Sequence, residues 1–228
     1  MNKNFLMILA LVFGLSFNVF AEAEKELDIN TALRLMKSAV IDQESPDSKI
    51  VINNSEYDIQ LWKDGPRKGL YASTALFRDS GFAGIFVGIF GQTAKGPRLL
   101  ASFTDLEPDG IDPPWNSMIG LDLTPYRISD QERAFGVEYH NSYQSTARGS
   151  ASTALYLFRY AKGALTLIFQ IRTQEGSNDP YGKYSEYHDR KIIMGKTKHK
   201  EFYDLMIKES ETKRITRYRW NGERYVKG

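Results

Sequence analysis

Hydrophobic and polar positions alternate in short stretches rich in β-branched and aromatic residues, and turn signals separate these stretches along most of the chain. In one stretch Leu165, Leu167, Phe169 and Ile171 share a face, so we expect that face to pack inward and the other to be mostly solvated. The pattern predicts a mainly β fold, an antiparallel hairpin meander in which propeller-like and sandwich arrangements both remain open. The predicted strands are 50–52, 57–62, 82–90, 99–104, 118–123, 135–140, 154–160, 164–172, 191–196, 202–208, 215–220 and 224–226.

A different rhythm precedes the strands. Leu33, Met36 and Val40 follow the spacing of one helical face, and Asp28 or Asn30 is available as an N-cap. The spacing predicts a single N-terminal α-helix of about 12 residues that ends near residue 43. A polar, turn-forming segment at 44–48 follows. We therefore divide the chain into a helix and linker at 22–48 and one antiparallel β domain at 49–228.

Two tight turns closed by glycine mark the clearest hairpins. Lys162-Gly163 and Asn221-Gly222 each follow an aromatic-rich strand, and the second is a strong hairpin signal because both residues tolerate positive φ. The last hairpin, 216–225, together with 202–207, resembles C-terminal hairpins of uncharacterised bacterial envelope proteins. The resemblance covers about 25 residues and consists mainly of turn chemistry. It implies an envelope location and β-structure, with no activity attached.

The first 21 residues have the pattern of a secretory signal. Lys3 precedes an apolar run over 5–20, and small Ala21 stands before acidic Glu22. The run is short for a membrane span, so we predict a cleaved signal and an exported chain, periplasmic or secreted, without a transmembrane anchor. An uncleaved N-terminal anchor is the alternative. Because the chain has no cysteine, neither disulfides nor thiol catalysis contribute.

Charge is distributed unevenly along the exported part. Residues 22–182 carry 16 basic and 21 acidic side chains, whereas residues 183–228 carry 13 basic and 7 acidic ones. A basic terminal segment suits an acidic partner, anionic lipid headgroups or nucleic acid, and export argues against nucleic acid. The simplest interpretation is that these charges solvate the outer faces of strands.

One acidic segment has the spacing of a metal loop. Asp105, Glu107, Asp109 and Asp112 lie near Gly110, and alternating carboxylates with a glycine turn are one way to gather the oxygens that Ca²⁺ needs. The segment departs from the EF-hand pattern at its third, fourth and twelfth positions. An acidic surface loop joining two strands is the alternative, and no cofactor other than calcium is suggested.

Two aromatic segments are candidate binding surfaces. Trp115 lies in a proline-punctuated segment that we expect to be irregular, and Tyr181, Tyr184 and Tyr187 lie in a polar segment that we expect to be a loop. Rigid aromatic side chains anchor partners or sugar rings at small entropic cost. The alternatives are that Trp115 folds back over a sheet edge and that the tyrosine segment is an exposed connection.

No sequence signature of catalysis stands out. The chain contains no nucleophile elbow, no phosphate-binding glycine loop and no histidine pair at zinc-ligand spacing. We therefore predict a non-enzymatic binding protein whose partner is a protein or envelope component, with an inhibitor or immunity factor as a subtype. The rivals are an envelope glycan hydrolase that uses carboxylates such as Glu138 and Asp109, and a calcium-stabilised structural module.

Overall fold

The computed structural model describes residues 27–41, 51–52, 56–79, 82–105, 116–145, 149–178 and 184–228, with the side chains of residues 79, 82, 83, 116, 178 and 184–186 left aside. The predicted signal at 1–21 and the predicted linker at 44–48 lie outside the described residues. The elements are α1 (Ile29–Ile41), β1 (Tyr57–Leu61), β2 (Leu70–Asp79), β3 (Phe82–Thr93), β4 (Gly96–Asp105), β5 (Asn116–Arg127), β6 (Arg133–Gln144), β7 (Gly149–Ala161), β8 (Ala164–Asn178), β9 (Tyr184–His199), β10 (Phe202–Glu209), β11 (Ile215–Trp220) and β12 (Tyr225–Lys227).

The predicted N-terminal helix is present and is capped by Asp28. The Asp28 carboxylate accepts hydrogen bonds from the Asn30 amide at 3.1 Å and from the Thr31 hydroxyl at 2.7 Å. These bonds, that from Thr31 foremost, lower the pKa of Asp28. Met36 and Val40 are buried on one face at helical spacing. Among the described residues, no helix has the length and apolar character needed to cross a membrane.

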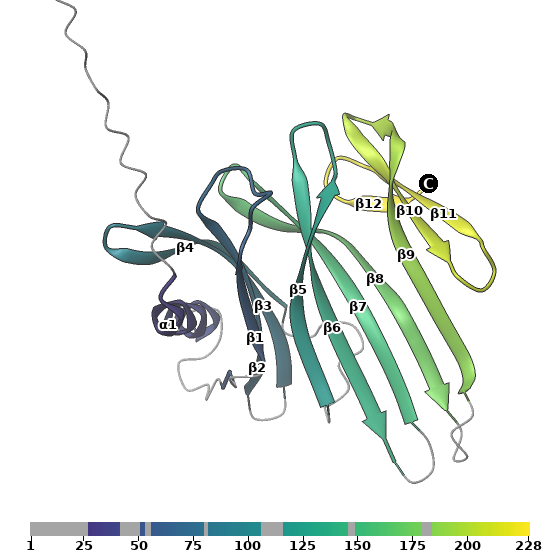
Figure 1. The fold of residues 1–228 in the computed structure, drawn as a ribbon, viewed down its shortest axis with the longest axis horizontal. Coiled ribbons are helices and arrows are strands. Elements are labelled where there is room, and N and C mark those ends of the chain that lie inside the picture. The colour runs from purple at the N-terminus through teal and green to yellow at the C-terminus, as the bar shows by residue number, and fades with distance from the viewer. Residues whose placement is uncertain are drawn as a thin grey trace, which may run out of the picture.

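The strands form two antiparallel meanders (Figure 1). One sheet has the order β1-β2-β3-β4, and the other runs β12-β11-β10-β9-β8-β7-β6-β5. In both sheets each strand pairs only with the strands that precede and follow it in the chain. This confirms the prediction of a mainly β, antiparallel meander with one helix. The Leu121 amide donates to the Asp58 carboxylate at 3.0 Å, which joins β5 to β1 where the sheets meet.

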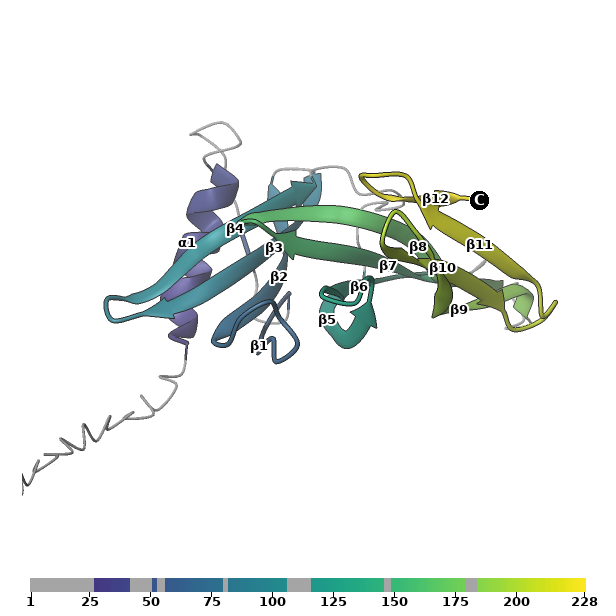
Figure 2. The same cartoon turned by 90° about the horizontal axis from the view of Figure 1, so that it is seen from above.

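The two sheets pack face to face like a sandwich. Side chains from β2 and β3 meet side chains from β5, β6 and β7 in a first core, with the Trp62 and Phe135 rings edge to face at 4.9 Å. The other face of β2 and β3 is covered by α1, which packs against Ala75, Phe77 and Phe86 (Figure 2). Strands β2 and β3 are therefore buried on both faces. This burial explains why residues 82–90 form a continuous apolar run instead of alternating with polar residues.

A third layer is formed by β10, β11, β12 and the second half of β9. Strand β9 pairs with β8 only along Gln174–Asn178 and then leaves it to pair with β10. Its continuation covers the outer face of β6, β7 and β8, and Leu205, Ile207 and Trp220 pack there against Leu155 and Leu157 in a second core. The residues of β7 from 153 to 158 are consecutively buried, because this strand lies between two cores.

The alternation predicted for β8 is wrong beyond Leu167. Leu165 and Leu167 pack against the first core, whereas Ile168, Phe169 and Ile171 belong to the second. The cause is a register shift between β7 and β8 that inserts Ile168 as an extra residue. The bulge reverses the side of the strand to which each later residue points, so Ile168, expected on the solvated face, is fully buried.

Two further strand predictions need correction, while the hairpin turns are confirmed. Strand β2 lies in a stretch for which no strand is predicted, and β9 begins at Tyr184, inside the segment interpreted as a tyrosine-rich loop. In the first turn Lys162 and Gly163 have positive φ, 52° and 80°. In the last turn Gly222 has a positive φ of 125°, but Asn221, for which the sequence also allows one, does not, and its side chain closes the turn instead.

Candidate functional site

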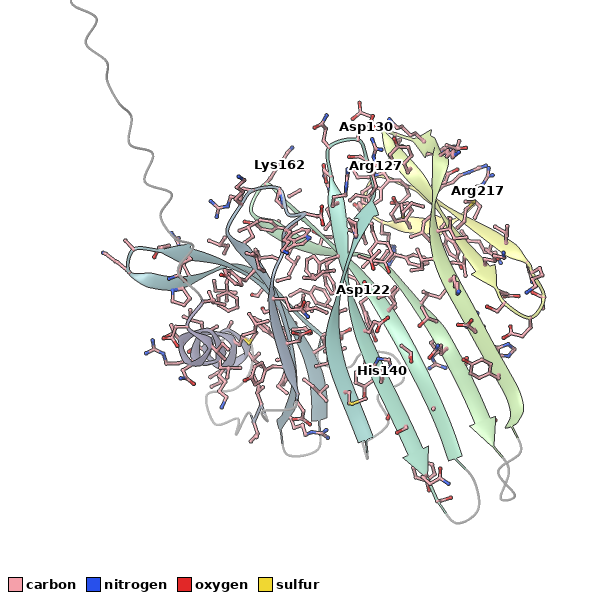
Figure 3. The ribbon with its side chains drawn as sticks, in the orientation of Figure 1. Asp122, Arg127, Asp130, His140, Lys162 and Arg217 are labelled. Carbon is pink, nitrogen blue, oxygen red and sulfur yellow. The ribbon has the colours of Figure 1, made fainter. Side chains whose placement is uncertain are left out.

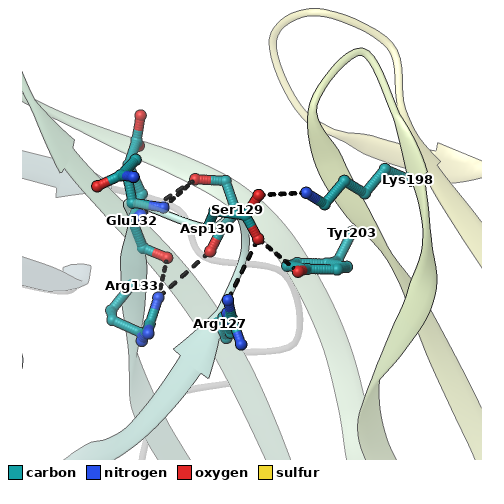
Figure 4. A network of polar contacts seen from close by, with 8 residues as sticks. Arg127, Ser129, Asp130, Glu132, Arg133, Lys198 and Tyr203 are labelled. Carbon is teal, nitrogen blue, oxygen red and sulfur yellow. Dashed lines mark hydrogen bonds and ion pairs between the residues drawn. The ribbon is translucent and has the colours of Figure 1, made fainter.

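The β5–β6 turn is attached to the β9–β10 hairpin by the carboxylate of Asp130 (Figure 4) and by a hydrogen bond that the Tyr203 amide donates to the Ile128 carbonyl at 2.8 Å. The carboxylate accepts hydrogen bonds from the Lys198 ammonium and, at 2.6 Å, from the Tyr203 hydroxyl, and it forms an ion pair with Arg127 at 3.2 Å. The bonds from Lys198 and Tyr203 lower the pKa of Asp130 to about 2. Lys198 and Arg127 also lie over the Tyr203 ring, at 4.9 Å and 5.4 Å from its centroid.

Next to this turn, Arg159 attaches β7 to the C-terminal strands. Two of its guanidinium nitrogens bind both carboxylate oxygens of Glu132, which raises the pKa of Arg159. The same guanidinium lies 5.1 Å from the centroid of Phe202 and 5.9 Å from that of Trp220. These two rings stack at 4.3 Å. The contacts fix β10 and β11 relative to β7.

Strand β12 is placed by its turn and by Tyr225. The Asn221 carboxamide oxygen accepts from the amides of Glu223 and Arg224, both at 2.9 Å, which closes the turn. The Tyr225 hydroxyl donates to the Tyr203 carbonyl at 2.9 Å. Burial of the phenol raises the pKa of Tyr225. Strand β12 is therefore held at a defined position although it has only three residues.

A groove of about 340 Å³ lies between β8 and β12. Residues 167–170 of β8 line one wall, and the other is lined by Arg224 of the preceding turn, residues 225–227 of β12 and Tyr218 of β11. Within the described residues no strand pairs with this stretch of β8 on the side away from β7, because β9 joins β8 only from Gln174 onward. Strand β12 is the last strand of its sheet. The groove thus lies between two strand edges.

The register of β12 shows which of its main-chain groups face the groove. The Asn221 amide bonds to the Arg224 carbonyl, and the Gly228 amide bonds to the Arg217 carbonyl. Hydrogen-bonded pairs alternate in an antiparallel ladder, so the pair Arg219 and Val226 between them is also hydrogen-bonded. The N–H and C=O groups of Tyr225 and Lys227 therefore point away from β11. These are the groups that another strand would use.

The lining of the groove combines apolar rings with cations. The Phe169 ring contacts the rings of Tyr218 and Tyr225, with centroids 4.9 Å and 6.4 Å apart. Arg224 and Lys227 are exposed at the rim, and neither forms an ion pair with another described residue. The groove therefore offers an apolar floor and a positive rim to a ligand.

Most residues predicted as binding or calcium sites lie outside what the structure describes. Trp115 and Tyr181 are among them, as are the acidic residues Glu107, Asp109 and Asp112. Asp105 ends β4. Among the described residues, no group of three or more acidic or histidine side chains has the arrangement of a metal site.

Of the other tyrosines predicted to bind, Tyr187 does not line the groove. Only the main chain of Tyr184 is described, and Tyr187 is an exposed side chain on β9, 49% accessible.

No known protein family, curated protein or solved structure matches the chain. The groove residues Tyr218, Arg224 and Tyr225 come from the last hairpin, for which the sequence predicts a turn but no binding site.

Glu138, the described carboxylate of the predicted hydrolase pair, lies elsewhere. It is 3.6 Å from the His140 Nε2 atom, and the Nδ1 atom of that ring is 2.8 Å from the Thr153 hydroxyl. His140 on β6 is well separated from Arg217 on β11 in Figure 3. Neither Glu138 nor His140 lines the groove, and Asp109, the other predicted carboxylate, is not described.

Proposed function

We propose that the protein is an exported binding protein whose groove between β8 and β12 takes an extended peptide segment of a partner protein. The bound segment pairs with the edge of β12 that no described strand occupies. The observation that carries this proposal is the orientation of the main-chain groups of Tyr225 and Lys227, which point away from β11 at the wall of an open groove. Strand addition of this kind gains affinity from main-chain hydrogen bonds.

The walls favour a peptide over a compact small molecule. Each wall is a run of four consecutive residues, so main-chain groups recur along the groove at the spacing of a strand. The volume of about 340 Å³ is at the small end of the range for ligand sites, roughly 300–1,000 Å³, and suits a short extended segment. The Phe169, Tyr218 and Tyr225 rings receive an apolar side chain, and Arg224 and Lys227 attract an acidic one.

Export is supported by the sequence of residues 1–21. A periplasmic or secreted protein that binds an extended segment of another protein suits the role of an inhibitor or immunity factor, because such a role needs a rigid sheet and an edge that a partner strand can join. The contacts of Asp130 and Arg159 supply that rigidity by holding β10 and β11 in place.

Selection and titration of peptides test the proposal. Random ten-residue peptides displayed on phage are selected against the purified protein, and the most enriched sequence is synthesised and titrated by fluorescence anisotropy. Lys227→Pro removes an N–H that points away from β11, so the β11–β12 pairing stays intact while the peptide loses one main-chain bond. We expect this variant to bind about tenfold more weakly. Lys227→Gln keeps the N–H and is the matched control for loss of the charge.

We expect enriched peptides to alternate apolar and acidic residues, and Lys227→Gln to lose less affinity than Lys227→Pro. Thermal unfolding monitored by circular dichroism checks that both variants are folded. Equal enrichment on the Lys227→Pro protein would contradict the proposal. A protein that dimerises through this edge, with dimerisation lost in Lys227→Pro, would assign the groove to a second copy of the chain and would also contradict it.

A further inference from the structure

The C-terminal strands have an outer face of unusual composition. Side chains of Ile192, Met194, Leu205, Ile207 and Tyr218 point into the second core. Side chains at the intervening positions therefore point outward. Those on the outer face, called here the basic face, are Lys191, Ile193, Met206, Lys208, Ile215, Arg217 and Arg219.

Positive charge on the basic face is poorly neutralised. Lys191 lies directly opposite Lys208 in the β9–β10 register, and like charges at such positions lower the stability of a sheet. Arg217 has one ion pair, to the buried carboxylate of Asp204 at 3.8 Å. Lys191, Lys208 and Arg219 form no ion pair with another described residue. A surface on which unneutralised cationic side chains repel one another suits an anionic partner.

Exposed apolar side chains lie among these cations. Ile215 is 57% accessible and Ile193 is 39% accessible. Ile215 lies opposite Lys208, which in turn lies opposite Lys191, so apolar and cationic groups share one cross-strand row. Soluble proteins seldom expose large apolar side chains together with unpaired cations unless the surface binds something.

We propose that the basic face binds an anionic lipid surface, with Ile193 and Ile215 entering the headgroup layer and the lysine and arginine side chains meeting lipid phosphates. Membrane surfaces attract proteins by this combination of buried apolar area and clustered positive charge. Single-stranded nucleic acid is recognised by exposed aromatic rings, but the aromatic rings of β11, Tyr218 and Trp220, point into the second core.

Lipid binding by the basic face is compatible with peptide binding in the groove. Val226 pairs with Arg219 and points to the same side as the basic face, whereas Tyr225 points into the second core beside the groove. The two surfaces therefore lie on different sides of the same strands. A partner segment can be held at the edge of β12 while the sheet rests on lipid.

Vesicle binding tests the proposal with the exported chain, residues 22–228, because the apolar run at 5–20 would itself bind lipid. The protein is sedimented with phosphatidylcholine vesicles and with vesicles that contain about one-third phosphatidylglycerol. We expect binding to the anionic vesicles only, with loss of binding at about 0.5 M salt, where the Debye length is about 4 Å. The double variant Lys191→Gln/Lys208→Gln should bind about 25-fold more weakly. Ile215→Ser should bind about tenfold more weakly.

The control is Lys63→Gln/Lys68→Gln, which removes the same charge from exposed positions in the β1–β2 turn. It should bind anionic vesicles as the unaltered protein does. Equal binding to both kinds of vesicle, or unchanged binding by Lys191→Gln/Lys208→Gln, would overturn the proposal. So would binding to soluble polyphosphate together with vesicle binding that Ile215→Ser leaves unchanged, because the ligand would then be a polyanion and not a lipid surface.

Discussion

Glycines permit the close packing of a strand that is covered on both faces. Gly84 of β3 pairs with Phe77 of β2, and a Cβ atom at position 84 would lie 2.2 Å from Cζ of the Phe77 ring. The ring therefore lies over the glycine, in a core where Phe77 is only 2% exposed. The sequence shows a glycine inside an apolar run, but it does not show which ring covers that glycine.

We expect Gly84→Ala to lower the free energy of unfolding by about 1–3 kcal/mol, because the methyl group must displace a buried ring. Gly120→Ala is the matched control, since Gly120 also lies within a strand and a Cβ atom there would meet no atom within 4 Å. This control should change stability by less than about 0.5 kcal/mol. Urea unfolding of both variants measures the difference in the free energy of unfolding. Equal losses of stability in the two variants would contradict the prediction, because they would show that the Phe77 ring moves aside without cost.

The turn beside the groove could be predicted from the sequence, but the contacts between the rings that line the groove could not. The Asn221-Gly222 turn predicts the last hairpin correctly. The meeting of Phe169 with Tyr218 and Tyr225 depends on the path of β9, which joins strands that are far apart in the chain. Local alternation does not report such contacts. Trp115 and Tyr181, which the sequence favours because aromatic rings stand in predicted loops, lie outside the described residues.

Strands can be predicted from the sequence where a turn signal bounds an alternating stretch. The prediction is poorer for a strand that is buried on both of its faces. No strand is predicted for β2 because its centre is the small-residue sequence Ala72-Ser73-Thr74-Ala75, in which Thr74 alone favours a strand. These four residues are fully buried between α1 and the first core, where larger side chains would not fit. In β8 the bulge at Ile168 changed the inward face without any interruption in the alternation.

The Asp130 contacts make a prediction about how the β5–β6 hairpin holds the β9–β10 hairpin. The folded-state pKa is lowered from 3.8 to about 2, so these contacts stabilise the fold fully above pH 3.8 and lose their effect as the pH falls through about 2. We expect Asp130→Asn to be less stable than the unaltered protein at neutral pH. The difference should shrink towards zero near pH 2.

Denaturant unfolding of both proteins at several pH values measures this difference. Asp64→Asn is a suitable control, because Asp64 is an exposed carboxylate of the β1–β2 turn and forms no ion pair with another described residue. A stability difference for Asp130→Asn that stays constant from neutral pH down to pH 2 would show that the carboxylate charge does not hold the two hairpins together.

At the scale of the whole molecule, the fold is a series of layers: α1, the sheet β1–β4, the strands β5–β8 with the start of β9, and the strands β10–β12 with the second half of β9 (Figure 1). The mainly β meander and its helix could be predicted from the sequence, which also shows the basic terminal segment. The sequence did not predict that the final strands would fold back over β6, β7 and β8. That return leaves a groove beside β12 and turns the basic face outward.

Hydrogen exchange followed by NMR on single amides shows whether a peptide binds the edge of β12, when the free protein is compared with the protein saturated by a selected peptide. We predict that the amides of Tyr225 and Lys227 exchange fast in the free protein and slowly in the complex, because the peptide accepts their hydrogen bonds. The amide of Val226, which bonds to β11, should be protected in both states. If Tyr225 and Lys227 are already protected in the free protein, or if the peptide leaves their exchange unchanged, the edge of β12 is not the binding site.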